Sequence, residues 1–200
     1  MLGAMDGQEP LIPALRRATC ARVATLDELM GPRCALDLGR YDRVLQALES
    51  FLSVWEPAVK AALPPHLQPW FQERSRSQLA RRDLEILDVM RLPSCLASRV
   101  DIETVAHAFG SLFVLESATQ GAPAVAKALL REHGINAATG GAYFHAFGPF
   151  TSAMWRDYEQ QVESWARDGL DRGQAIDAAM RTFDALQETF RTVCDEPISA

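Results

Sequence analysis

The sequence has a shortage of positive charge, no close cysteine pair and no long apolar run. Its 20 lysines and arginines are outnumbered by 26 aspartates and glutamates, and the resulting net charge of −6 argues against a dedicated binder of nucleic acid or of an anionic membrane. The four cysteines include no Cys-X-X-Cys pair, so neither a zinc cluster nor a redox motif is indicated. The two least charged stretches, 104–126 and 135–155, contain histidine, glycine and proline, whereas a membrane span needs about 20 predominantly apolar residues.

The amino terminus also lacks the features of a secretory signal. Asp6 and Glu9 stand where a signal needs positive charge, and no apolar segment follows them. We therefore expect a cytoplasmic protein with reduced thiols. The length of 200 residues, with 48% hydrophobic and 23% charged side chains, is typical of one globular domain. That domain is expected to span residues 1–200, with flexible tails at 1–9 and 195–200.

Helical periodicity runs through most of the chain. Apolar residues recur every three or four positions in six stretches, 11–30, 41–59, 79–87, 105–130, 150–165 and 176–190. Ser98 is a candidate N-cap for the fourth stretch, and Gly121 and Pro123 predict a bend within it. No segment shows the sustained two-residue alternation of a strand. The sequence therefore predicts an all-α domain of about seven helices.

Five stretches of the chain, in order, match the motifs of one enzyme family. Residues 15–27 are similar to an opening helix with the pattern ATxxxHxxL and an acidic residue. The next two stretches, GRYDRVLQALESFLSVWEPAVKAALP and RRDLEIL, resemble the second and third helices of that family. The motifs LYVLEGSxLGGRVIA and GAxFFxGYGxxxxxMWxxF are matched by LFVLESATQGAPAVAKAL and GAYFHAFGPFTSAMWRDYEQ. The family is the bacterial biliverdin-producing heme oxygenases, especially those that accompany bacteriophytochromes, and the likeness covers nearly the whole chain in register.

This resemblance implies a fold, a ligand, a reaction and a partner. In the family, heme lies between a proximal helix, whose neutral histidine binds the iron, and a distal helix that bends at glycines over the opposite face. Oxygen and reducing electrons then convert heme to biliverdin, carbon monoxide and ferrous iron. The resemblance thus implies a tetrapyrrole ligand, heme or a related molecule, and as a partner a bacteriophytochrome or another signalling protein.

The positions that match the family's site residues depart from its pattern. Val23 stands at the position of the iron-binding histidine, and valine has no lone pair to give iron. Arg16 matches a basic residue that meets a heme propionate. On the distal helix one glycine of three survives, and Phe113 and Phe147 stand where the family has tyrosine. The tetrapyrrole-binding residues that the resemblance implies are Arg16, Thr19, Val23, Phe113, Ser117, Gly121 and Ala122, of which Ser117 and Ala122 replace glycine.

Two residues are candidates for a substitute iron ligand. His107 lies on the same predicted helix as the distal segment, two turns before it. Cys20 lies one turn before Val23, and a cysteine thiolate also binds heme iron in some proteins. A lone histidine in a buried helix is nevertheless a common, hydrogen-bonded part of a protein core.

Three functions stay open at this point. The first is a divergent, tetrapyrrole-binding or regulatory member of the family in which heme cleavage is impaired or absent. The second is an active heme oxygenase with a substitute iron ligand or none from the protein. The third is a different enzyme of a related fold, such as a dinuclear iron protein, but only Glu103 and His107 have the spacing of such ligands. The family register further predicts that Val23 and Gly121 face one another across a common cavity.

Overall fold

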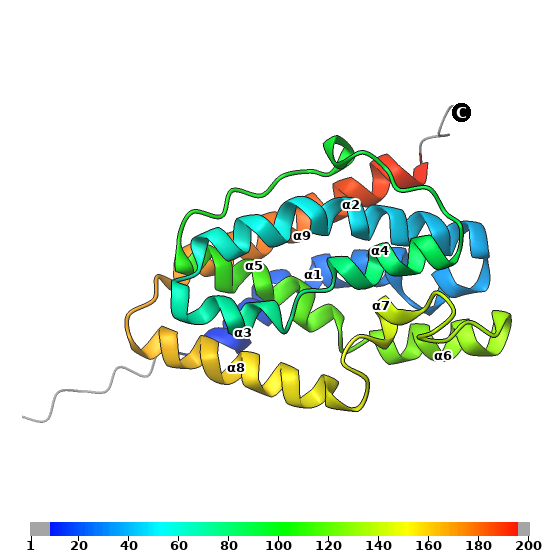
Figure 1. Cartoon of the computed structure of the whole chain (residues 1–200). Coiled ribbons are helices and arrows are strands. Elements are labelled where there is room, and N and C mark those ends of the chain that lie inside the picture. Colours follow the sequence, from blue (N-terminus) through cyan, green and yellow to red (C-terminus); the bar gives the residue numbers. More distant parts are fainter. Residues whose placement is uncertain (1–8, 196–200) are drawn as a thin grey trace, which may run out of the picture.

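The computed structural model describes residues 9–195, and in that range every regular element is a helix (Figure 1). Seven helices have ten or more residues: α1 (Leu11–Met30), α2 (Leu38–Ala62), α4 (Ser77–Ile86), α5 (Val105–Ala118), α6 (Ala122–His133), α8 (Thr151–Arg167) and α9 (Arg172–Asp195). The helices α3 (Gln68–Gln72) and α7 (Ala142–His145) are short, and single 3₁₀ turns lie at Pro32–Leu36, Pro65–Leu67, Ser94–Leu96 and Gly148–Phe150. The prediction of an all-α fold with about seven helices is confirmed.

The helix boundaries follow local chemistry. Helix α1 ends at Gly31, whose backbone N–H donates to the carbonyl of Asp27 at 2.9 Å. Helix α2 begins after Asp37, whose Oδ1 accepts a hydrogen bond of 2.7 Å from the backbone N–H of Arg40, as an N-cap residue does. The predicted bend is a complete break, because α5 ends at Ala118 and α6 begins after Gly121 with proline in its first turn.

Helix α5 is the centre of the fold. Ten of its 14 residues are buried, and it packs against α2, α8 and most extensively α9. Figure 1 shows it in the middle of the bundle, with α2 and α9 along one side and α8 along the other. A hydrogen-bonded chain crosses three helices, since Trp55 Nε1 donates to Ser111 Oγ at 2.6 Å and Ser111 Oγ contacts Thr182 Oγ1 at 2.6 Å. The position of α5 is therefore fixed from several sides.

Helices α5 and α9 approach closely at Gly110. A Cβ atom built at this glycine would lie 1.8 Å from the backbone oxygen of Ala175 on α9. No real side chain tolerates that distance, so glycine is required here by the packing of two backbones.

The structure corrects one local prediction and leaves another outside its range. Ser98 is not the N-cap of α5; that residue is Thr104, whose Oγ1 accepts from the backbone N–H of His107 at 3.1 Å. The backbone N–H of Ser98 instead donates to Thr189 on α9. Except for Glu9 and Asp195, the predicted tails at 1–9 and 195–200 lie outside the described residues.

The helices were also compared with the length and hydropathy that a membrane crossing requires. Within residues 9–195 none of them is both long and apolar enough to span a bilayer.

Candidate functional site

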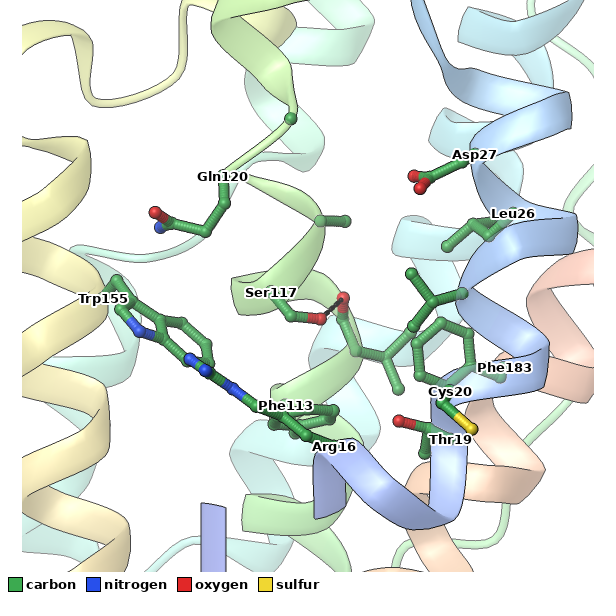
Figure 2. Close-up of a pocket in the computed structure, with 14 residues that line it drawn as sticks. Arg16, Thr19, Cys20, Leu26, Asp27, Phe113, Ser117, Gln120, Trp155 and Phe183 are labelled. Carbon is green, nitrogen blue, oxygen red and sulfur yellow. Dashed lines mark hydrogen bonds between the residues drawn. The ribbon is translucent and has the colours of Figure 1, made fainter. Parts of the chain in front are cut away.

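A cavity of about 610 Å³ lies between α1, α5 and α8, with α9 behind it (Figure 2). This volume falls within the roughly 300–1,000 Å³ of typical small-molecule sites. The lining residues come from α1 (Arg16, Thr19, Cys20, Val23, Leu26 and Asp27), from α5 and the turn after it (Phe113, Val114, Ser117, Ala118, Gln120 and Gly121), from α8 (Trp155) and from α9 (Phe183).

One face of α1 forms a long wall of the cavity. Its lining residues recur at intervals of three and four, so they lie on one side of the helix. From Arg16 to Asp27 this wall rises by about 16 Å at 1.5 Å per residue. The hydroxyl of Thr19 donates to the carbonyl of Leu15 at 2.9 Å, so within α1 it is already satisfied. The wall therefore offers apolar contact along its middle and charged groups at its two ends.

Aromatic side chains give the opposite walls their shape. Phe113 and Phe183 are buried, and the Phe113 ring meets that of Trp155 edge to face, with centroids 6.1 Å apart. Tyr158, one turn after Trp155, donates from its hydroxyl to the carbonyl of Phe109 at 2.8 Å and so ties α8 to α5. The result is a preformed apolar surface suited to a flat, largely apolar ligand.

A buried ion pair behind the cavity also holds α5 and α8 together. The guanidinium of Arg74 bonds the carboxylate of Glu116 at 3.1 Å and also contacts that of Asp157 on α8. Burial raises the pKa of Glu116, while Arg74 and Arg76 act in the opposite direction. Because Glu116 directly precedes Ser117 in α5, this pair fixes the helix segment that lines the cavity.

Arg16 places a cation at the rim. Its side chain lies beside the Trp155 ring (Figure 2), with the guanidinium 5.4 Å from the ring centroid. The guanidinium also pairs with Glu159 at 3.3 Å. The side chain is 60% exposed, so this ion pair contributes little and can exchange for another anion. Stacking on Trp155 nevertheless holds the charge beside the cavity, where it can meet a carboxylate of a bound ligand.

The end of α5 is less crowded than its sequence suggests. Ser117 turns its hydroxyl back to the carbonyl of Val114 at 3.0 Å. Gly121 has an ordinary helical conformation, with φ −83°, and a Cβ atom there would meet nothing closer than the Ala118 oxygen at 3.7 Å. Its glycine is thus not required by the fold. Ala122 lines a neighbouring cavity of about 240 Å³, which Gly121 shares, and not the main cavity.

No histidine lines this cavity within residues 9–195. His66 stacks on Trp165, and His133 Nε2 lies 2.9 Å from the carbonyl oxygen of Ala35. The substitute candidate His107 also lies elsewhere, and its Nδ1 accepts from the backbone N–H of Glu103 at 3.3 Å.

Cys20 is the one sulfur donor among the lining residues. Within residues 9–195 no cluster of three or more histidine, cysteine, aspartate or glutamate side chains could hold a metal. The cavity therefore fits the flat organic part of a tetrapyrrole but does not fit an iron held by imidazole.

The cavity brings together most of the residues singled out by sequence. Six of the seven line it, namely Arg16, Thr19, Val23, Phe113, Ser117 and Gly121, and so does Cys20. Sequence reasoning missed the lining roles of Leu26, Asp27, Val114, Ala118, Gln120, Trp155 and Phe183. Helical spacing from Val23 could have identified the two on α1. Trp155 belongs to the Met-Trp pair of the last quoted motif, but that motif does not show that its side chain reaches this cavity, and nothing in the sequence alone distinguishes Phe183 from the other aromatic residues of the core.

Comparison with solved structures gives the fold of the chain a precedent. A heme oxygenase from Neisseria meningitidis, whose crystal structures were determined in NO-bound and CO-bound forms, superimposes with a TM-score of 0.76, and the match covers 96% of each chain. The chain has the heme oxygenase fold. The two sequences are 16% identical, so the likeness concerns the fold alone. No protein-family model matches the chain, and no curated protein shows a significant sequence match.

Proposed function

We propose that this protein binds a tetrapyrrole in the cavity between α1 and α5 and that its ability to cleave heme is impaired or absent. One observation carries the proposal. Six of the seven residues that the family resemblance implied as ligand-binding line the same cavity, and that lining contains no imidazole. Val23, which matches the position of the family's iron ligand, lies in the middle of the α1 wall. The proposal includes the implied partner, a bacteriophytochrome or another signalling protein.

Different lining residues would contact different parts of a bound tetrapyrrole. Phe113, Phe183 and Leu26 offer apolar contact to the faces of a flat ring system, and Arg16 offers a charge to its propionates. Bound heme would supply oxygen and redox chemistry through its iron. The chain would bind and orient it, but Val23 would leave the face toward α1 without a protein ligand.

The alternative, an active heme oxygenase, has one structural feature in its favour. Cys20 lies in the lining, is exposed and stands one turn from Val23, where a thiolate could replace the missing imidazole. A Cys20→Ser variant separates the two proposals, because only thiolate ligation makes the heme spectrum depend on this residue.

The test is a titration of the purified protein with hemin, followed by reductant and oxygen. We expect a Soret band shifted from that of free hemin, without the spectrum of a histidine-ligated ferric heme and with little gain of biliverdin. Arg16→Gln should weaken binding by about tenfold, as for loss of one charge-assisted hydrogen bond. Arg17→Gln is the matched control, because Arg17 is also an exposed arginine of α1 but does not line the cavity. Equal loss in both variants, or no binding of any tetrapyrrole, would refute the proposal.

A further inference from the structure

Two polar side chains of the cavity have no partner within the described part of the chain. The Asp27 carboxylate and the Gln120 amide both line the cavity, both are exposed, and neither makes a side-chain hydrogen bond or ion pair to another residue between 9 and 195. By contrast, the hydroxyls of Thr19 and Ser117 already donate to backbone carbonyls of their own helices, and the guanidinium of Arg16 has an exposed ion pair that another anion can replace. Asp27 and Gln120 therefore have hydrogen-bonding capacity that is available to a ligand.

The Asp27 carboxylate and the Gln120 amide lie on two different sides of the cavity. Figure 2 shows the Asp27 carboxylate extending from α1 toward α5, and the Gln120 amide extending from the end of α5 toward α8. Asp27 can only accept hydrogen bonds when ionised, whereas Gln120 can donate and accept at once. A ligand that uses both groups must present N–H donors to the first and a paired donor and acceptor to the second.

A closed porphyrin ring does not present such groups. The four nitrogens of heme bind its iron, and those of a metal-free porphyrin point into the centre of the ring. The edge of the ring carries apolar substituents and two carboxylates, which a bilin also carries and which only accept hydrogen bonds when ionised. An open-chain tetrapyrrole differs, because its pyrrole N–H groups are accessible once the ring is open and each end is a lactam with adjacent N–H and C=O groups. A lactam pairs with a primary amide through two hydrogen bonds.

We infer that the preferred ligand of this cavity is an open-chain tetrapyrrole, a bilin, with Gln120 pairing with a terminal lactam and Asp27 accepting from pyrrole N–H groups. This inference rests on the proposed function and specifies its ligand class. Both residues then determine specificity for the open chain, while Arg16 and the aromatic walls contact features that bilins and porphyrins share.

The experiment compares three probes, biliverdin, metal-free protoporphyrin IX and hemin, by absorbance and fluorescence-quenching titration of the full chain. Wild-type protein should bind biliverdin at least about tenfold more tightly than protoporphyrin. Gln120→Leu and Asp27→Asn should each weaken biliverdin binding by about tenfold, as expected for loss of one to two hydrogen bonds, and leave protoporphyrin affinity unchanged. Gln160→Leu is the matched control, since Gln160 is an exposed glutamine of α8 outside the cavity.

The outcomes separate this inference from the proposed function. If protoporphyrin or hemin binds as tightly as biliverdin, or if Gln120→Leu weakens all three equally, the bilin preference is wrong and the tetrapyrrole site stands. If none of the three probes binds, both proposals fail. Because Gln120 and Asp27 are exposed, both variants should fold, and an unchanged thermal unfolding midpoint checks this. Gln120→Glu provides a second variant, which keeps the shape and the acceptor but removes the donor, and it should also lose the preference.

Discussion

Replacing Val23 with histidine tests whether one missing side chain separates this cavity from a histidine-ligated heme site. Val23 is half-buried and packs against the core, so its loss should cost about 1 kcal/mol, less than the roughly 1.5–3 kcal/mol of a fully buried valine. For a chain of this size the melting temperature should fall by about 2–4 °C. Val23→Ala loses the same contacts without adding an imidazole, so it isolates the effect of the new ligand.

The assay is a hemin titration of each variant, recorded as the Soret spectrum and as the thermal shift on binding. Val23→His should acquire the spectrum of a histidine-ligated heme, and hemin at 100 times its Kd should stabilise it by about 2.7 kcal/mol. Thr25→His controls for a histidine added to α1 outside the cavity. A wild-type spectrum in Val23→His, or the same new spectrum in Thr25→His, would show that position 23 does not face the iron. Biliverdin formation should further require Ser117→Gly, while Ala122→Gly should add little because Ala122 lines the neighbouring cavity.

Three further substitutions test the packing that positions the site, each by urea denaturation. Gly110→Ala should destabilise the fold by about 1–3 kcal/mol despite the better helix propensity of alanine, because its Cβ would lie 1.8 Å from the Ala175 oxygen; neutrality would show that α5 and α9 do not cross there. Gly121→Ala should instead stabilise the fold by about 0.4–1 kcal/mol, because the new Cβ atom would lie 3.7 Å from its nearest neighbour, the Ala118 oxygen. A loss of stability would show that another atom lies closer to this position than 3.7 Å. Ala146→Gly should stabilise by about 1 kcal/mol, since Ala146 has φ 37° and ψ −111°, a strained conformation for alanine; no gain would mean that this strain is absent.

Helix positions could be predicted from sequence because apolar periodicity and helix-breaking residues act locally. The stripe from Leu11 to Met30 and the Gly31-Pro32 stop define α1 without knowledge of any other helix. The predicted N-cap of α5 was wrong because its choice depends on a contact between distant parts of the chain. Ser98 and Thr104 both have N-cap side chains, and a tertiary contact, the hydrogen bond from the backbone N–H of Ser98 to Thr189 on α9, decides between them.

The site was predictable only where one helix supplies several lining residues. Arg16, Thr19 and Val23 share a face of α1, so identifying one locates the others. Trp155 and Phe183 reach the cavity from helices that come later in the chain, and their contribution depends on how those helices cross α5. The availability of Gln120 also depends on tertiary structure, because a glutamine in a turn is unremarkable until its neighbours are known to leave its amide without a partner.

The cysteines of the chain allow a direct measurement of where a tetrapyrrole binds. Cys20 is exposed and lines the cavity, whereas Cys95 is exposed on the 3₁₀ turn Ser94–Leu96, outside it. Cys34 is buried, and burial raises the pKa of its thiol to about 12, so it should stay unreactive in the folded protein.

The measurement is the rate of iodoacetamide alkylation at each cysteine, by peptide mass spectrometry, with and without saturating biliverdin or hemin. We predict that bound tetrapyrrole slows alkylation of Cys20 at least about tenfold, in line with the fraction of sites occupied at ten times the Kd, and leaves Cys95 unchanged. Equal alkylation of Cys20 with and without bound ligand would contradict the assignment of this cavity as the tetrapyrrole site.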